Sequence, residues 1–180
     1  MKNPIALVTA CLILFSSCEM ADENIPVTEF EESVALKAYY DVSFSLDNSA
    51  RLFSTLTGES YAEEMVDETS GPLIDLVSIT NEAFIAFTSP DDEQDDYEVP
   101  NASFTAIQHL DSPITAAQFD NMVNGNLLAE MEVEADNESI GISDFKDHII
   151  VFRNAAGEQG AIKLRMLNAE RLVVDIKITQ

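Results

Sequence analysis

Apolar and polar side chains alternate along much of the chain after residue 33, which is the pattern of β-strands with one buried face. Residues 36–46, LKAYYDVSFSL, give a clear example. Five of their side chains would share the buried face: Ala38, Tyr40, Val42, Phe44 and Leu46. Tyr39 would then point to solvent. Asp47, Asn48 and Ser49 predict a turn, and residues 51–58 predict a strand that pairs with the first.

A hairpin and three further strands are predicted downstream. Residues 72–80 and 83–89 flank a polar turn and predict a hairpin that stops at Pro90. Residues 148–154, 160–167 and 171–179 predict three antiparallel strands. In the last of these, four apolar residues would share one face: Leu172, Val174, Ile176 and Ile178. Arg171, Asp175 and Lys177 would point the other way.

One short helix is predicted near residues 116–123. Thr115 and Gln118 have the spacing of a capping box, in which each side chain bonds the free backbone N–H of the other residue. Ile114 and Phe119 have the spacing of a hydrophobic staple. The buried stripe would be Phe119, Met122 and Val123, and the helix would end at Asn124 and Gly125. Residues 126–136 fit a strand and a helix equally well. The fold class is therefore mainly β, an antiparallel sandwich- or barrel-like sheet with one covering helix.

The N-terminal segment has a different pattern. Residues 5–15 form an apolar run after Lys2, too short for a membrane span of about 20 residues but suited to a signal peptide. Ser16 and Ser17 precede Cys18, an arrangement that resembles the lipobox of bacterial lipoproteins, although Phe15 stands where Leu is usual. The predicted organisation is a signal peptide over 1–17, an acidic flexible tether over 18–33 and one β-rich domain over 34–180.

The positions of the two cysteines support the prediction of a lipoprotein. Cys11 lies inside the segment that would be removed, so Cys18 would be the single thiol of the mature chain and could form no internal disulfide. The resemblance implies that lipid is attached to Cys18 and anchors the protein permanently in a membrane. The alternative is an ordinary secretory peptide that is cut elsewhere.

The strongly negative net charge of the chain limits which classes of partner it can bind. The chain has 9 basic and 33 acidic residues, a formal net charge of −24, and no Lys or Arg between Arg51 and Lys146. Such a field repels phosphate backbones, so nucleic acid is not an expected partner. A salty habitat would also explain the acid excess without any ligand.

Several segments in order carry a family resemblance: IDLVSI, FTSPDD, TAAQFD, IIVFRNAAGEQGAIKLRML and LVVDIKI. With the lipobox and the acidic tail, the chain looks like the small β-rich surface lipoproteins of the Bacteroidota, most of which have no assigned function. The resemblance implies an outer-membrane protein, and the acidic residues Glu19, Asp22 and Glu23 resemble the export signal for the cell surface in that phylum. A periplasm-facing location is the alternative.

The C-terminal strands are also similar, more remotely, to haem-scavenging lipoproteins that hold iron between two histidines. This chain has two histidines, His109 and His148, and neutral imidazoles suit haem iron. The alternative places His109 in a loop and His148 at the start of a strand. If the histidines have these structural positions, no cofactor is expected.

The segment SPDDEQDDYE offers oxygen ligands to a cation such as calcium, with Asp91, Asp92, Asp95 and Asp96 as the candidates. The spacing is not that of an EF-hand, which needs alternate ligands, a turn glycine and a distal Glu. A solvated acidic loop without metal is the favoured interpretation.

Catalytic motifs are absent from the sequence. It has no G-x-S-x-G elbow, no H-E-x-x-H, no C-x-x-C and no glycine-rich phosphate loop. A hydrolase that uses paired carboxylates stays open, because such pairs form in space rather than in sequence. We therefore expect a binding domain that is not an enzyme.

The expected ligand is a protein or a glycan. Sugar sites use aromatic platforms, and Tyr39 is the candidate that the strand pattern places at the surface, beside a polar row. The alternative is a structural accessory subunit of an outer-membrane assembly. A binding domain predicts a concave pocket with a few polar groups, whereas a subunit predicts a contiguous apolar patch.

Overall fold

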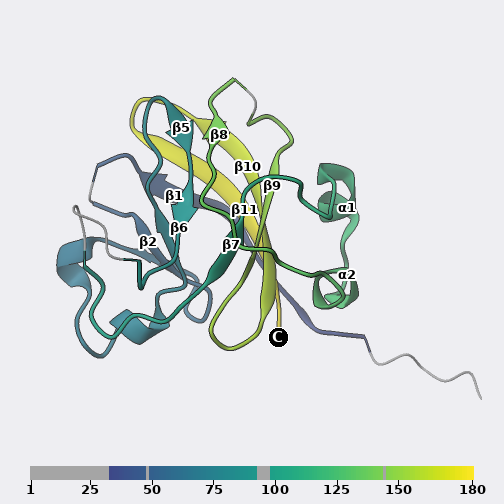
Figure 1. Ribbon diagram of the computed structural model, residues 1–180, viewed down its shortest axis with the longest axis horizontal. Coiled ribbons are helices and arrows are strands. Elements are labelled where there is room, and N and C mark those ends of the chain that lie inside the picture. Colours follow the sequence, from purple (N-terminus) through teal and green to yellow (C-terminus); the bar gives the residue numbers. More distant parts are fainter. Residues whose placement is uncertain (1–32, 48, 93–97, 144) are drawn as a thin grey trace, which may run out of the picture. The chain divides into compact units, whose positions relative to one another are not determined.

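A computed structural model of the protein describes residues 33–47, 49–92, 98–143 and 145–180, all of which belong to one compact unit (Figure 1). The predicted signal peptide, Cys18 and nearly all of the predicted tether lie outside the described residues, as do Asp95 and Asp96. Within the described ranges, no helix has the length and apolar character needed to cross a membrane.

The larger sheet has five antiparallel strands in the order β1-β11-β10-β9-β7. Their bounds are β1 Leu36–Ser45, β7 Ala106–Gln108, β9 Ile149–Arg153, β10 Gln159–Leu167 and β11 Arg171–Thr179. The three C-terminal strands match the prediction from the sequence. Leu36 pairs with Thr179 and Ser45 with Arg171, so the first strand lies beside the last.

The smaller sheet has four antiparallel strands in the order β3-β2-β4-β6. They are β2 Leu52–Ser54, β3 Glu59–Tyr61, β4 Leu76–Ser78 and β6 Phe87–Thr88, and β4 with β6 confirms the predicted hairpin. A separate pair joins β5 Phe84–Ile85 to β8 Ile140–Gly141. Two short 3₁₀ helices, η1 Glu63–Met65 and η2 Gly71–Leu73, follow β3.

The predicted pairing of residues 51–58 with the first strand is wrong. A turn closed by Ser45 N–H on the Ala50 carbonyl, 2.9 Å, carries the chain from one sheet to the other. Arg51 holds this turn because its guanidinium donates to the carbonyl of Leu46 at 2.7 Å. The strand that follows, β2, therefore pairs with β3 and β4.

The two sheets pack face to face over the main core, as in a sandwich, and the described strands do not close into a barrel. This core includes the predicted row Leu172, Val174, Ile176 and Ile178 of β11. The opposite face of the larger sheet is covered by helices α1 Ala116–Asn121 and α2 Asn126–Ala129, which Figure 1 shows on the side away from the smaller sheet. The mainly β, antiparallel fold class is thus confirmed.

Helix α1 begins as predicted. Thr115 Oγ1 accepts from the N–H of Gln118, the Gln118 side chain accepts from the N–H of Thr115, and the staple residues Ile114 and Phe119 are buried. The prediction that Val123 is buried is wrong, since it is 90% exposed. The helix ends at Asn121 and Met122 is already extended, so Val123 no longer follows the helical period.

The undecided segment 126–136 forms a short helix followed by extended chain that belongs to no strand. Its first residues form α2, and the side chain of Leu128 in this helix is fully buried. Beyond the helix, Met131 and Val133 are buried while Glu132 and Glu134 are exposed, an alternation without a ladder of strand pairing.

Strand β1 corrects the assignment of its two tyrosines. A bulge lies between Tyr39 and Val42, and Asp41 within it has a left-handed φ of 54°. The extra residue reverses the alternation, so Tyr39 packs against the main core and Tyr40 is 65% exposed. The sequence prediction was the reverse because it assumed an unbroken period of two.

Lys177, on the charged face of β11, lies under helix α1, whereas Arg171 on the same face is exposed. Lys177 Nζ donates to the carbonyls of Phe119 (2.7 Å) and Met122 (3.1 Å), at the end of α1. Burial lowers the pKa of Lys177, although the charges of Asp120 and Asp175 act in the opposite direction. Its neighbour Lys163 contacts both oxygens of Asp120. These lysines fix α1 to the sheet.

Candidate functional site

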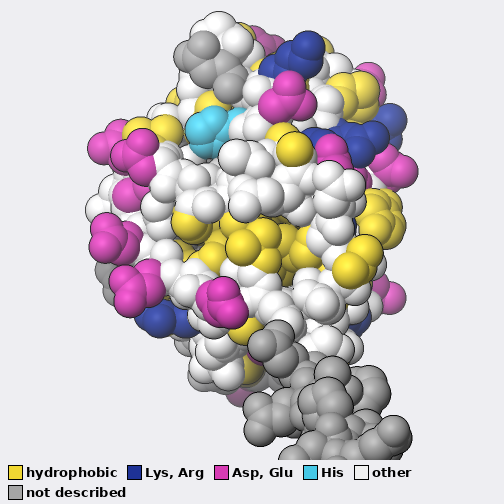
Figure 2. Space-filling view, turned by 90° about the vertical axis from the view of Figure 1, so that its right-hand side faces the viewer, with side chains coloured by type: hydrophobic (Ala, Val, Ile, Leu, Met, Phe, Trp, Pro, Cys, Tyr) yellow, Lys and Arg dark blue, Asp and Glu magenta, His cyan; other side chains and the backbone are white. Residues whose placement is uncertain are grey.

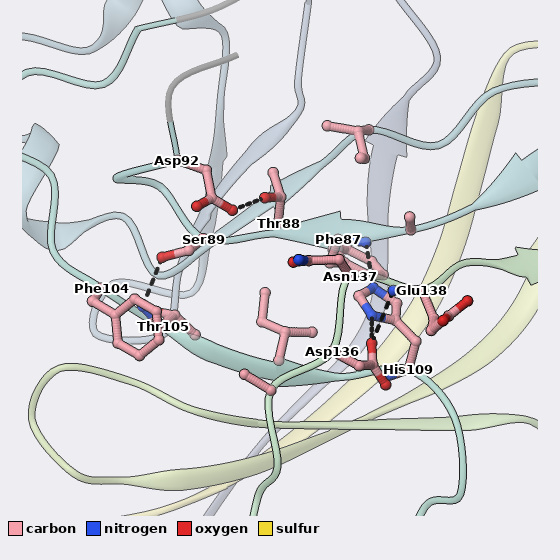
Figure 3. A pocket seen from close by; sticks show the side chains of 14 residues that line it. Phe87, Thr88, Ser89, Asp92, Phe104, Thr105, His109, Asp136, Asn137 and Glu138 are labelled. Atoms are coloured by element: carbon pink, nitrogen blue, oxygen red, sulfur yellow. Dashed lines mark hydrogen bonds and ion pairs between the residues drawn. The ribbon is translucent and has the colours of Figure 1, made fainter.

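A cleft of about 410 Å³ lies where β6, an edge strand of the smaller sheet, and β7, an edge strand of the larger one, line a common space (Figure 3). Phe87 and Thr88 come from β6, and Ile107 comes from β7. Residues 135–138 complete the wall, because the N–H of Asp136 donates to the carbonyl of Ile107 at 2.9 Å and holds that segment along β7.

His109, directly after β7, joins the two sheets across this seam. Its side chain is 2% exposed. Nδ1 lies 2.7 Å from Oδ1 of Asp136, and Nε2 lies 3.0 Å from the backbone nitrogen of Phe87 in β6. A backbone N–H can only donate, so Nε2 is the acceptor and Nδ1 carries the proton. The imidazole thus replaces a strand-to-strand hydrogen bond at an otherwise open edge.

Asp136 is the ionised partner of this pair. Burial alone would raise its pKa, but hydrogen bonds from Leu110, His109 and Glu138 outweigh burial and leave the pKa below its ordinary value. Oδ2 accepts from the N–H groups of His109 (2.8 Å) and Leu110 (3.1 Å), and Oδ1 accepts from that of Glu138 (3.2 Å). A carboxylate held by several donors favours its charged form. Sequence reasoning missed this residue, because it is one acid among many in an acidic stretch.

The two histidines predicted as haem ligands do lie near each other. Nε2 of His148 bonds the backbone carbonyl of His109 at 2.6 Å. Both ring nitrogens of His109 and Nε2 of His148 are therefore engaged in hydrogen bonds. An axial ligand of haem iron needs a free nitrogen lone pair, and so does a general base. His109 has no such lone pair, whereas His148 donates through Nε2 and keeps the lone pair of its Nδ1. The pair His109–Asp136 has the composition of a catalytic dyad, but its Nε2 lone pair faces the N–H of Phe87.

The acidic residues predicted as metal ligands are partly described. Asp91 accepts a hydrogen bond from the Ser89 hydroxyl, and Asp92 accepts one from the Thr88 hydroxyl. Across the described parts of the chain, no three His, Cys, Asp or Glu side chains are grouped to hold a metal ion. The calcium site as predicted also needs Asp95 and Asp96, which are outside those parts.

Ligand-accessible groups line both sides of the cleft. Figure 3 shows Phe104 and Asp92 on one side, with Asn137 and Glu138 on the other. Phe104 is 56% exposed, and its neighbour Thr105 is fixed by its N–H on the Ser89 hydroxyl at 2.8 Å. Asp92 was predicted, as a metal ligand, whereas Phe104, Asn137 and Glu138 were not predicted as site residues.

Tyr39, the predicted aromatic platform, is far from this role. Its ring packs edge-on against Phe53, with the ring centroids 5.5 Å apart, and its hydroxyl donates to the carbonyl of Thr55. It also covers Gly58, where an added Cβ would come within 2.3 Å of the ring. Tyr39 is therefore a packing residue of the core and does not line the cleft.

The cleft is built wholly from the part of the chain that lacks cations. Its lining residues fall between Ile79 and Glu138, inside the stretch from Arg51 to Lys146 that contains no Lys or Arg. Asp92, Asp136 and Glu138 line it without a basic neighbour in the wall. An anionic ligand would therefore be repelled.

A second partly buried carboxylate, Asp75, lies outside the cleft. Asp75 Oδ2 accepts from the N–H and the hydroxyl of Thr55, at 2.7 and 2.6 Å. Burial raises the pKa of Asp75, and the charge of Glu158 adds to this, although the bonds from Thr55 act against it. Asp75 positions the turn after β2, so its hydrogen bonds serve packing.

Comparison with known proteins gives a fold neighbour. The chain matches no protein-family model, and no curated protein matches it significantly. A crystal structure of a DUF4466 family protein from Parabacteroides merdae ATCC 43184 is similar, with a TM-score of 0.50 and 14% sequence identity. The match covers 79% of this chain and 53% of that chain, so the present chain spans about half of the neighbour's length. The likeness concerns the fold alone, and its source is a member of the Bacteroidota.

Proposed function

We propose that the protein is a lipid-anchored lipoprotein of the outer membrane whose folded domain binds a ligand without catalysis, in the cleft between β6 and β7. The cleft supports the ligand-binding part of this proposal. Its volume of about 410 Å³ is within the range of small-ligand pockets, and its wall combines an exposed aromatic ring with convergent polar groups.

Lipid anchoring is supported by the sequence around Cys18, with its preceding apolar run and small residues. Protein purified from its native host should begin at Cys18 and carry the mass of the acyl chains. The variant Cys18→Ala should leave the membrane fraction. An unmodified thiol with the leading residues still attached would contradict this half of the proposal.

Exposure at the cell surface is supported by the acidic residues Glu19, Asp22 and Glu23. Protease added to intact cells should degrade a surface lipoprotein, while a soluble periplasmic marker should survive. Protection of the protein in intact cells, with loss after the outer membrane is opened, would instead place it facing the periplasm.

The binding site is tested by a substitution that fills the cleft. Ala135 lines it and is exposed, so Ala135→Trp should occupy the space without disturbing the core. Ala155→Trp, at an exposed turn between β9 and β10, is the matched control. A mixed library of sugars, peptides, amines and organic acids should yield compounds that raise the melting temperature of wild type and of Ala155→Trp but not of Ala135→Trp. A library in which every binder tolerates Ala135→Trp would refute the cleft as the site.

An accessory subunit of an outer-membrane assembly is the second candidate. Figure 2 shows hydrophobic side chains gathered in a hollow on the face that carries α1 and α2. Apolar residues of this layer that are only partly buried include Leu36, Met122 and Leu127. For a subunit, Val123→Asp beside this layer should abolish co-purification of an envelope protein. Ile142→Asp, at another exposed apolar position, should not.

A further inference from the structure

The cleft contains polar side chains that the fold itself does not use. Within the described residues, Asn137 and Glu138 have no hydrogen bond from their side chains, and both are exposed. Asp92 accepts from Thr88 through Oδ2, and its other oxygen has no partner among the residues that the structure describes. An amide can donate and accept, whereas ionised carboxylates only accept. Together these groups suit a ligand that presents many hydroxyl donors.

The aromatic ring of Phe104 gives the cleft an apolar surface on the opposite side. The ring is 56% exposed, and the backbone of the next residue, Thr105, is held by its hydrogen bond to Ser89. The C–H face of a sugar ring is apolar while its rim carries hydroxyls. Phe104 across from Asn137 and Glu138 therefore fits both surfaces of such a ring (Figure 3).

The negative charge of the cleft wall favours neutral sugars over acidic ones. The cleft wall contains Asp92, Asp136 and Glu138 and no Lys or Arg, and the whole chain has a net charge of −24. A uronic acid, a sulfated sugar or a sugar phosphate would meet these carboxylates without a compensating cation, which is unfavourable at short range and on approach.

We propose that the cleft binds a saccharide that carries no negative charge, with one sugar ring on Phe104 and its hydroxyls bonded by Asp92, Asn137 and Glu138. This inference rests on the proposed binding function and specifies its ligand class. Asp136 is excluded from direct contact because His109 and three backbone N–H groups occupy it.

The test uses the full chain, solubilised in a detergent without a sugar head group so that the detergent cannot compete. The probes are neutral oligosaccharides of the gluco-, manno-, galacto- and N-acetylhexosamine series, with oligogalacturonides and sulfated oligosaccharides in parallel. We expect binding to members of the neutral set alone, measured by glycan array and then by calorimetry.

Three variants separate the cleft from other surfaces. Phe104→Ala should weaken binding at least about tenfold, as expected for a central aromatic contact, and Glu138→Gln should weaken it by less. Tyr40→Ala removes an equally exposed aromatic ring outside the cleft and should bind as wild type does.

The possible outcomes separate the saccharide assignment from the proposal that the cleft binds a ligand. Binding of acidic sugars, an affinity unchanged by Phe104→Ala, or no saccharide binding at all would overturn the saccharide assignment. If the mixed library still contains binders that Ala135→Trp abolishes, the cleft remains a ligand site for another chemical class. If it contains none, the binding function fails as well.

Discussion

The backbone N–H of Asp41 donates to Oδ1 of Asp175 across 3.0 Å, from the bulge of β1 to the neighbouring strand β11. The other oxygen of Asp175 accepts from Arg165 at 2.8 Å. Asp175 is 4% exposed, so its carboxylate satisfies a backbone donor that the bulge removes from the ladder. This contact helps to set which tyrosine of β1 enters the core.

Removing that carboxylate should destabilise the protein. Asp175→Ala leaves the Asp41 N–H without its acceptor and removes the partner of the exposed Arg165, which should lower the free energy of unfolding by about 2 kcal/mol. Asp175→Asn keeps one acceptor for Asp41 and should cost less. Urea unfolding measures both. Equal losses in the two variants would show that the bulge contact contributes little.

The two adjacent tyrosines should respond very differently to truncation. Tyr39→Ala removes a ring packed on Phe53 and should cost about 2 to 3 kcal/mol. Tyr40→Ala removes an exposed ring and should change stability by less than about 0.5 kcal/mol. Thermal unfolding of the pair provides the comparison, and the opposite order would restore the unbroken alternation that the sequence predicts.

Local sequence patterns predicted the positions of the strands and the helix well, but they predicted less well which strands pair with each other. The Thr115–Gln118 box and the alternation in β11 depend on neighbours within a few residues, so both could be predicted. The bulge at Asp41 and the pairing of β1 with β11 depend on contacts with residues far along the chain, which periodicity does not contain. The error at Tyr39 and Tyr40 follows directly from that limit.

The candidate site was predicted in part for the same reason. His109 was identified as a chemical candidate, but its role follows from Asp136 and from the N–H of Phe87, each more than twenty positions away. Phe104 and Asn137 belong to no motif. The lack of cations between Arg51 and Lys146 was the one signal in the sequence that describes the cleft itself.

His109 should prove to be structural. His109→Phe keeps an aromatic ring of similar size but leaves the Phe87 N–H without its acceptor and removes one of the donors to Asp136, which should lower the free energy of unfolding by about 2 kcal/mol. The Phe87 amide should also exchange its hydrogen faster. His148→Phe loses a single bond and should cost about 1 kcal/mol. Unchanged exchange at Phe87 would argue against the bridge between the sheets.

Asp75 should give the protein an unusual pH dependence. Its folded pKa is raised above the ordinary value of 3.8 by burial, so the folded state holds this proton more tightly than the unfolded state does. Stability from this group is present at pH below 3.8 and is lost as pH rises through the folded pKa. Asp75→Asn keeps an acceptor for Thr55 without the charge, and should be more stable than wild type at neutral pH, with the advantage fading in acid.

Asp67 provides the contrast, because its pKa is lowered by hydrogen bonds from Ser70 and Thr69. Stability from Asp67 is present above 3.8 and is lost as pH falls through its folded pKa. Asp67→Asn should therefore be less stable than wild type at neutral pH, and the difference should close in acid. Melting temperatures of the three proteins between pH 3 and pH 7 check both signs. Curves that run parallel throughout would contradict them.

Strand β11 is made after every other strand, yet it lies between β1 and β10 in the larger sheet. During synthesis β1 must wait for its neighbour until nearly the entire domain has emerged, and the loop to be closed is long. Folding should accordingly be late and cooperative. Until the C-terminal hairpin of β10 and β11 is available, the domain should remain unfolded. An unfolded chain can pass through a narrow channel that would exclude the folded domain.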